Sequence, residues 1–514
     1  LHNITALAGG ERRRTRSTNT SIYYMGFDES TLAYKPVNPT TLVNLKGTES
    51  LAGNFNWSST GSNWINEIEN RYVSFYANAA YAFDSKYNLT ASIRIDQSNL
   101  FGTDPRYQYR PLWSVGGAWH LSKERFIAGK LSWLNNLTLR LTYGIGGNVP
   151  RGAGPFVTIK AAQYNPWSKD FGAEIKNPPN YTLRWEKTAT ANLGIDFALL
   201  DNRLSGSIEV YRKHSTDLLA QRDADPTLGF RQLTLNYGNM TNRGVELTLN
   251  SVNLQTRHLR WTTGVNFGYN KNTLDDVEDS NPNVLSYTSG FAAVKGHPLG
   301  AIFSYRYAGL SGTDGTPRYY VDGGNRTDAQ VRNLADLAYS GTRHHTYSGS
   351  LSNTIAYKNF KLSFMFMFYG GNVLRTEAAP YLSEPTHLNP NKEMNNIWRQ
   401  PGDERNPDAT PAFTGYALDL TTMVHPWHAA DKHVFKADYA KLRHVSLTYR
   451  VPQQLVSRCH LSQLAFTLQA QNLFRWTANS YNIDPEALGT TGYGWGMRAI
   501  PSPSTWTLGV SATF

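Results

Sequence analysis

Apolar and polar side chains alternate with a period of two along most of the 514-residue chain. In the stretch 137–145, Leu, Tyr and Ile at the odd positions are separated by small or polar residues. The stretches 193–199, 261–270 and 464–471 follow the same rule. Successive side chains of a strand point to opposite faces, so the pattern predicts strands with one apolar and one polar face.

This alternation predicts about fifteen strands. Most of them have ten or more residues, which exceeds the usual five or six of a soluble sheet and suits a tilted crossing of about 30 Å of hydrocarbon. Strand length therefore favours an all-β, antiparallel transmembrane barrel. The expected strands are 2–10, 71–83, 87–96, 110–121, 136–146, 184–199, 204–217, 232–250, 258–272, 298–309, 344–357, 360–370, 437–451, 461–474 and 504–514.

The connections between these strands alternate between short and long. Short turns are expected at 84–86, 200–203, 251–257, 358–359 and 452–460, and long loops near 11–70, 147–183, 371–436 and 475–503. Outer-membrane barrels have this asymmetry, with short periplasmic turns and long extracellular loops. The alternation fails only between 273 and 343, where a sixteenth strand at 316–321 would restore it.

A sheet in lipid must close on itself, because unpaired backbone groups find no water there. Fifteen or sixteen strands could close alone as a porin-sized barrel, or they could be the later part of a larger one. The chain opens on Leu1 rather than Met, so it is either a mature chain or a fragment. We expect residues 1–514 to belong to one barrel domain.

The amino-acid composition excludes several other classes of protein. Only 17% of residues are charged, 13% are aromatic, and no apolar run approaches the roughly 18 residues of a membrane helix. The single cysteine, Cys459, cannot form an internal disulfide. The net charge of +11 is better explained by scattered loop cations than by nucleic-acid binding, because the only basic run is Arg12, Arg13, Arg14 and Arg16.

Several motifs are shared with one family. They include LTLRLTYGIGGN at 137–148, the long stretch at 181–219 that begins YTLRWEKTATANLGIDF, NYGNMTNRGVELTLN at 236–250, PLGAIFSYRYAGL at 298–310, WRQPGDE at 398–404, DYAKLRHVSLTYRVP at 438–452, AQNLF at 470–474 and the closing PSPSTWTLGVSATF. In this order and spacing they resemble the C-terminal part of SusC/RagA-like TonB-linked outer-membrane transporters of Bacteroidetes.

The resemblance implies more than the strand pattern does. It implies a 22-stranded barrel in the bacterial outer membrane, with a signal peptide, a TonB-interacting segment, a plug and the first strands all upstream of this chain. It also implies a SusD-like surface lipoprotein that acts as a lid, and energy from the TonB-ExbB-ExbD system. The implied substrates are nutrient oligomers, typically oligosaccharides and in some members peptides. No cofactor is implied.

No local catalytic motif is present in the sequence, so an enzyme is not expected. An outer-membrane hydrolase and a passive or adhesive barrel that binds surface ligands are the alternatives. Polar side chains on the predicted lumen face are Thr138, Arg140, Asn192, Asp196, Asn266, Gln469 and Gln471. Loop aromatics that could stack on sugars, or else only pack within loops, are Trp398, Trp427, Tyr493 and Trp495.

Four groups of potential metal ligands are not expected to bind a metal, and all except the pair His344 and His345 are better interpreted as solvated loop. His425, His428 and His433 have no helical spacing, and the adjacent His344 and His345 would point to opposite faces of a strand. Acidic stretches could offer oxygen ligands to calcium but lack EF-hand spacing. They are Asp275, Asp276, Glu278 and Asp279, and DGGNRTD at 322–328.

The last strand carries Trp506, Leu508, Val510 and Phe514 on one face and Thr, Gly and Ser on the other. This division predicts a lipid-facing stripe and a lumen-facing stripe. The terminal aromatic residue resembles the C-terminal signal by which outer-membrane barrels are recognised for assembly.

Overall fold

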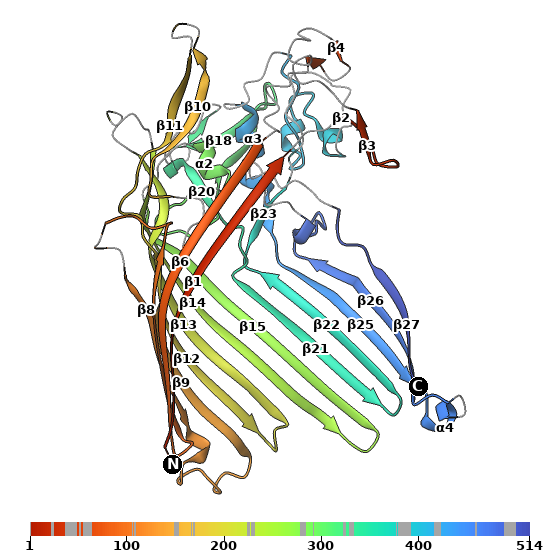
Figure 1. Cartoon of the computed structure of the whole chain (residues 1–514). Coiled ribbons are helices and arrows are strands. Elements are labelled where there is room, and N and C mark those ends of the chain that lie inside the picture. Colours follow the sequence, from red (N-terminus) through yellow and green to blue (C-terminus); the bar gives the residue numbers. More distant parts are fainter. Residues whose placement is uncertain are drawn as a thin grey trace.

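The fold was analysed in a computed structural model, dominated by one antiparallel sheet of 14 strands (Figure 1). The structure describes residues 2–21, 25–35, 49–50, 53–54, 64–104, 106, 109–148, 154–165, 167, 170–223, 227, 232–277, 284–290, 292–321, 325–327, 334–376, 378, 392–415, 423–457, 460–487 and 500–514. We call this 14-stranded sheet the wall.

The strands of the wall follow one another in chain order, each paired with the next. In that order they are β1 (His2–Ser21), β6 (Trp64–Phe83), β7 (Tyr87–Ser98), β8 (Pro111–His120), β9 (Leu134–Asn148), β12 (Glu186–Leu199), β13 (Leu204–Asp223), β14 (Gln232–Gln255), β15 (Leu259–Asp276), β21 (Tyr347–Tyr357), β22 (Phe360–Gly370), β25 (Tyr439–Arg450), β26 (Gln463–Thr477) and β27 (Thr505–Thr513).

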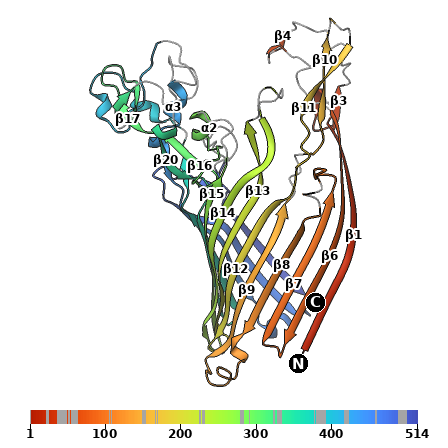
Figure 2. The same ribbon diagram turned by 90° about the vertical axis from the view of Figure 1, so that its left-hand side faces the viewer.

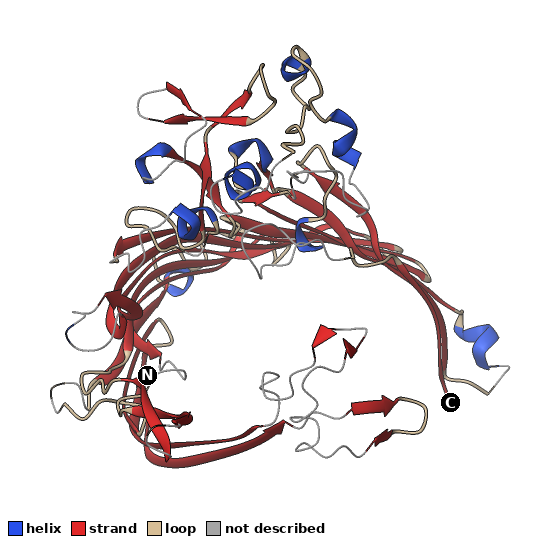
Figure 3. Ribbon diagram, turned by 90° about the horizontal axis from the view of Figure 1, so that it is seen from above, coloured by secondary structure: helices blue, strands red, loops and turns tan. Residues whose placement is uncertain are grey.

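Seen from above, the wall curves into an open arc with β1 and β27 as its edges (Figure 3). Its short turns lie at one end of the strands together with both termini, and its long connections lie at the other (Figures 1 and 2). This arrangement confirms the expected all-β class and the large antiparallel sheet. Sequential antiparallel neighbours are what short connections produce.

The two faces of the wall differ as the alternation predicts. Leu193 of β12 lies opposite Val210 of β13, which lies opposite Val245 of β14, and that residue faces Tyr269 of β15. All four side chains are exposed, at 38–50% of their full area. An outer-membrane barrel turns such a face to lipid. We therefore call the apolar face the outer face and the opposite, polar face the inner face.

Tight turns close the wall at its short-loop end. In the turn after β12, Leu200, Asp201 and Asn202 have positive φ values of 54°, 56° and 62°. Asp and Asn adopt this left-handed region more readily than most residues. The amide of Arg203 donates to the carbonyl of Leu200 at 3.1 Å. Local turn chemistry thus fixes the register of β12 and β13.

Two predicted strands are not part of the wall, and this corrects the expected number. The segment 298–309 forms β16 (Ala301–Tyr305), paired with β20 (Leu337–Thr342), and the start of β17 (Tyr307–Leu310). The proposed sixteenth strand is β18 (Pro317–Val321), which lies between β17 and β19 (Asn325–Thr327). Both small sheets belong to a connection between β15 and β21, so up-and-down alternation holds without an added strand.

Several wall strands continue beyond the membrane-sized lengths predicted for them. β1 and β6 have 20 residues each, and β14 has 24. The basic run Arg12 to Arg16 therefore lies in β1 rather than in a loop, where Arg14 and Arg16 pair with Glu69 and Glu67 of β6, both at 2.7 Å. Strand pairing and ion pairing together extend this hairpin.

The remaining elements are short. Small hairpins are β2 (Met25–Asp28) with β3 (Ala33–Lys35), β4 (Glu49–Ser50) with β5 (Gly53–Asn54), β10 (Thr158–Asn165) with β11 (Asp170–Asn177), and β23 (Val373–Arg375) with β24 (Val434–Lys436). The helices are α2 (Val284–Thr288), α3 (His425–His428) and α4 (Gln453–Val456). In the described part of the chain, no helix is both long and apolar enough to cross a membrane.

The last strand, β27, pairs along its whole length with β26. Trp506, Leu508 and Val510 lie opposite Ala470, Leu468 and Phe466, and are 64%, 73% and 61% exposed. Phe514 is 93% exposed, beyond the end of the strand. This apolar stripe is the surface on which the predicted assembly signal depends.

Deletion of Phe514 is expected to lower the amount of inserted barrel more than the uptake per inserted molecule. The ring packs little in the fold, so its loss removes a recognition feature rather than a core contact. Surface quantity and uptake per molecule would be measured in the same cells. Normal surface quantity with defective uptake would contradict the prediction.

Candidate functional site

The inner face of the wall carries the predicted lumen residues at register positions that share one surface. Asp196 lies opposite Thr138, and Gln469 and Gln471 lie opposite Ser446 and His444. Asn266 donates to the hydroxyl of Ser350 at 3.3 Å. Hydroxyl and amide groups dominate these rows, as suits a hydrated interior. Whether these side chains contact a solute remains a prediction.

The charged members of the inner face are largely paired with one another. Arg140 of β9 forms two hydrogen bonds with Asp196 of β12, at 2.7 and 2.8 Å, and a third with Glu209 of β13, at 2.8 Å. Asn192 donates to the other oxygen of Glu209 at 2.9 Å. One guanidinium thus joins three consecutive strands, which the sequence pattern alone did not indicate. The cluster combines one cation with two carboxylates, so it keeps a net negative charge on this part of the inner face.

At the long-loop end, which is expected to be extracellular in such barrels, three distant segments fold into one unit. We call it the extracellular body, and it comprises the described residues within 284–342, 373–415 and 423–436. Its largest apolar cluster combines Tyr287, Phe303, Tyr305 and Ala429 with neighbours from the same segments. The amide of Tyr305 donates a hydrogen bond to the carbonyl of Ala429 at 3.1 Å. In Figure 2 these elements, including β16, β20 and α3, lie beyond the ends of the wall strands.

Arg375 is the central polar contact of the extracellular body. Its side chain is buried, and its guanidinium donates to the carbonyls of Thr288 and Phe303 and to the hydroxyl of Ser304, the last two at 2.8 and 2.9 Å. Burial lowers the pKa of Arg375 to about 10. The group therefore stays charged at neutral pH, and these oxygens compensate its removal from water.

The predicted stacking residues Trp398 and Trp427 lie inside the extracellular body. Trp427 has no exposed area and packs edge-on against Tyr307 and His433, with ring centroids at 5.8 and 4.6 Å. Trp398 is 9% exposed, contacts Leu310 and Ala412, and donates to Glu404 at 3.2 Å. Both rings thus have the packing role that was the alternative to solute stacking. Tyr493 and Trp495 lie outside the described residues.

The histidines of HPWHAADKH are not solvated, which corrects that expectation. His425 and His433 are buried, and His425 shares a hydrogen bond of 2.7 Å with Thr288. No group of three or more potential metal ligands occurs among the described residues. Asp275 accepts from Thr241 and Asp276 pairs with Lys295 at 3.2 Å. Glu278, Asp279 and most of 322–328 are outside the described chain.

Burial also sets the charge of these histidines. It lowers the pKa of His425 to about 4 and that of His433 to about 3, with nearby cations contributing in the same direction. The folded body therefore holds both rings neutral, whereas the unfolded segment takes up protons below its ordinary pKa of about 6.5. The contribution of the two neutral rings to the stability of the body is fully present above about pH 6.5, and it is lost as the pH falls towards 4 and 3.

We expect the extracellular body to become more susceptible to protease as the pH falls from 7.5 to 5. The substitution His433→Phe should reduce this sensitivity, because phenylalanine cannot take up a proton when the segment unfolds. The fold should tolerate the change, because the buried ring nitrogen Nε2 of His433 has no hydrogen-bond partner to lose. His258→Asn, at an exposed turn, is the control and should leave the pH response unchanged. Equal acid sensitivity in the wild type and His433→Phe would contradict the account.

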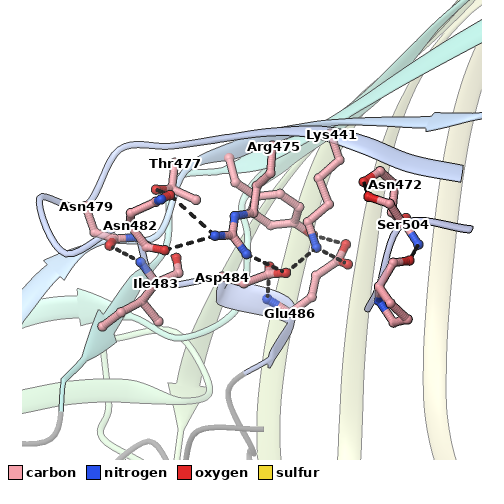
Figure 4. A network of polar contacts seen from close by, with 12 residues as sticks. Lys441, Asn472, Arg475, Thr477, Asn479, Asn482, Ile483, Asp484, Glu486 and Ser504 are labelled. Atoms are coloured by element: carbon pink, nitrogen blue, oxygen red, sulfur yellow. Dashed lines mark hydrogen bonds and ion pairs between the residues drawn. The ribbon is translucent and has the colours of Figure 1, made fainter. Parts of the chain in front are cut away.

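A second contact zone joins a loop to the inner face near β25 and β26 (Figure 4). Lys441 donates to Asp484 and to Glu486, both at 2.7 Å, and Arg475 lies 3.3 Å from Asp484. The side chains of Lys441 and Asp484 are only 5% and 3% exposed. Figure 4 shows the loop 479–487 held against the wall by this cluster, which we call the loop latch.

The loop latch balances burial against pairing. Burial alone would raise the pKa of Asp484 and Glu486, but the hydrogen bonds from Lys441 and its charge outweigh that effect and lower both pKa values. Tyr439 adds a hydrogen bond to Glu486 at 2.8 Å, and Arg443 also pairs with Glu486. Both acids thus stay ionised and hold the loop at neutral pH.

A pocket of about 470 Å³ opens where β15 and β21 enter the extracellular body. Its lining includes Asn242, Asn270 and Asn272 with Tyr339 and the pair His344 and His345. The predicted strand 344–357 begins only at Tyr347, so the two histidines are not on opposite faces of a strand and line the same pocket. Amide, imidazole and phenol groups offer hydrogen bonds to a neutral polar solute.

Comparison with known proteins places this architecture in a family. The family model described as TonB dependent receptor-like, beta-barrel matches residues 3–366. The chain belongs to the TonB-dependent receptor-like β-barrel family. This is a family of outer-membrane receptors rather than enzymes, which removes the hydrolase alternative and confirms the outer-membrane location.

Individual relatives support the SusC/RagA-like resemblance. The receptor is 26% identical over 576 residues to TonB-dependent receptor P39 of Formosa agariphila, covering 100% of this chain and 51% of that one. It is 27% identical over 314 residues to TonB-dependent receptor SusC of Bacteroides thetaiotaomicron, covering 57% and 31% of the two chains. The chain thus spans about half the length of the curated relative that it matches throughout.

Solved structures show the same fold. A structure of the RagAB peptide transporter superposes with a TM-score of 0.78 at 22% identity, covering 100% of this chain and 53% of that one. A structure of the RagAB peptide importer in an open-open state gives 0.77. The wall of this receptor is therefore built as the corresponding part of that barrel.

Proposed function

We propose that this receptor forms the wall and the extracellular body of an active importer that carries a nutrient oligomer across the bacterial outer membrane. The observation that carries the proposal is the wall itself: 14 consecutive strands with an apolar outer face, a polar inner face and a folded body at the long-loop end. Import needs a wide polar passage and no covalent chemistry, and the inner face of the wall offers such a polar surface.

The proposal includes parts outside this chain. Both edges of the wall, β1 and β27, have unpaired backbone groups on one side, which lipid does not satisfy. We take further strands, up to the 22 that the family resemblance implies, to close the barrel between them, and a plug to fill its lumen. The half-length coverage of the relatives supports this division.

The proposed partners are a SusD-like lipoprotein above the extracellular body and the TonB-ExbB-ExbD system acting through the plug. The similarity to SusC and to RagAB supports them, and the extracellular body provides a folded platform at the mouth. Copurification of a lipoprotein with the full-length receptor is the expected result.

The proposed solute is an oligosaccharide, with a peptide as the second candidate. Hydroxyl and amide groups on the inner face, and the amides of the 470 Å³ pocket, which Lys271 also lines, favour a strongly hydrogen-bonding solute. The peptide is favoured by a different observation, the superposition on a barrel whose title names it a peptide transporter.

Uptake by cells that produce the full-length receptor tests the proposal. Labelled oligosaccharide and peptide pools would be supplied separately, and the retained compounds identified by mass spectrometry. Enrichment of oligosaccharides is the expected result, and enrichment of peptides alone would replace the solute. No enrichment over cells without the receptor would favour a passive or adhesive barrel that binds surface ligands.

A further inference from the structure

Three cations lie side by side on the outer face of the wall, where apolar side chains are otherwise expected. Arg212 of β13 is directly opposite Arg243 of β14, and Arg243 is directly opposite Lys271 of β15. All three side chains are exposed. We call them the cation row. Their face is fixed by register, because each lies two residues beyond an apolar member of the row Val210, Val245 and Tyr269.

The position of the cation row along the strands matches the outer border of the membrane. Below it on the same face lie apolar residues, among them Phe267 of β15 and, at the start of β13, Leu204. From Leu204 to Arg212 is eight residues, or roughly 26 Å of strand at about 3.3 Å per residue, which a strand tilt of about 40° reduces to about 20 Å along the membrane normal. Above the cation row the face becomes polar, with His214, Thr241 and Thr273. The change from apolar to polar side chains thus places the row near the upper border of an apolar band that is about 25 Å tall in such barrels.

The surface around the cation row is hollowed. A shallow depression of about 620 Å³ is lined by all three cations and, on the membrane side, by Leu141, Leu193 and Val245. Tyr269 also lines it, at the depth where aromatic side chains meet the headgroup region. A ligand that fits this depression needs an anionic end at the cations and an apolar body below them.

The cations have no carboxylate partner within the described chain. No ion pair or hydrogen bond engages the side chains of Arg212, Arg243 and Lys271 among the residues that the structure describes. The carboxylate of Asp275, further along the face, already accepts from Thr241 and lies 3.5 Å from His214. Like charges placed directly across strands destabilise a sheet, and a bound anion would offset that repulsion.

The same row on neighbouring strands is uncharged. Ala191 of β12 lies opposite Arg212, and Tyr143 of β9 lies opposite Ala191. The cations are therefore confined to three consecutive strands rather than spread along the rim. Strands lie about 4.8 Å apart, so the row spans about 10 Å, a width suited to one or two phosphate groups.

We propose that the cation row and the depression beneath it bind the phosphate groups of a phosphorylated glycolipid in the outer leaflet, with its acyl chains along the apolar outer face. Arginine binds phosphate through two parallel hydrogen bonds, and lysine adds a point charge. The cation row lies on the outer face of the wall, although Lys271 also lines the 470 Å³ pocket at the long-loop end.

Native mass spectrometry of the detergent-purified full-length receptor tests the site. The probes are phosphorylated lipid A, the same lipid A with its phosphates removed, and inorganic phosphate. The wild-type receptor should retain phosphorylated lipid A and neither of the other two. The triple substitution R212Q/R243Q/K271Q should reduce that retention at least about tenfold, since each cation near a lipid surface contributes about 1 kcal/mol.

The matched control is R125Q/K130Q/R257Q, which removes the same charge from exposed turns at the opposite end of the wall. It should retain phosphorylated lipid A as the wild type does, and R243Q alone should give an intermediate loss. Only barrels that keep their folded mobility in gels would be compared. Equal retention of the dephosphorylated lipid, or equal loss in the control, would overturn the proposal.

Discussion

Replacement of Trp427 by alanine is expected to unfold the extracellular body while the wall still inserts. Trp427 has no exposed area and contacts segments from both long connections, through Tyr307 and His433. Truncating a fully buried tryptophan costs about 3–5 kcal/mol, a large share of what a small loop core provides. The wall depends instead on strand pairing and on lipid. Uptake should fall at least about tenfold with a normal amount of inserted receptor.

Protease added to intact cells measures this outcome, because it reaches only the extracellular side. Cleavage within 284–436 should accelerate in Trp427→Ala, and the folded gel mobility of the barrel should persist. Trp133→Ala is the matched control, since that ring is 48% exposed near a short turn. An unchanged cleavage rate in Trp427→Ala would show that the body does not depend on this core.

Substitution of Lys441 by methionine should release the loop 479–487 from the inner face. The lysine ammonium is the shared donor to Asp484 and Glu486, both at 2.7 Å. Without the ammonium group, the two carboxylates lose their shared cation and repel each other. Breaking a buried ion pair in this way lowers stability by about 3–5 kcal/mol. Hydrogen exchange of the amides in 479–487 should accelerate by about two orders of magnitude or more.

Lys361→Met provides the comparison for this experiment. Lys361 belongs to the neighbouring strand β22 and is exposed. Its substitution removes the same charge from the wall and leaves the loop latch intact. Exchange in 479–487 should match the wild type in that variant. Slow exchange in Lys441→Met would mean that the loop is held by other contacts.

The wall could be predicted from the sequence because its strands are amphipathic. Alternation such as that of 137–145 records directly which side chains face lipid and which face the lumen. The strands expected at 298–309 and 316–321 were assigned to the wrong sheet, because β16 and β18 pair within the extracellular body and all five residues of β16 are buried. Period-two alternation reports a half-buried strand and does not say which sheet contains it.

The extracellular body was missed for a related reason. Its core joins Tyr287, Phe303 and Ala429, which are separated by up to 142 positions in the chain, and no local pattern records such contacts. The local pattern consequently predicts a solvated loop for the histidines, and for Trp398 and Trp427 it leaves solute stacking and loop packing as alternatives. Arg375 shows the same limit: a lone arginine in a loop gives no sign that three segments will surround it.

Uptake of labelled oligomer in matched cells with and without TonB tests the central claim most directly. Both strains would carry equal amounts of the full-length receptor in the outer membrane, and surface binding would be measured separately at low temperature. Energy-coupled import predicts that accumulation falls to the level of cells lacking the receptor when TonB is absent, while surface binding is retained. Equal accumulation in the two strains would contradict the account and identify the wall as a passive channel.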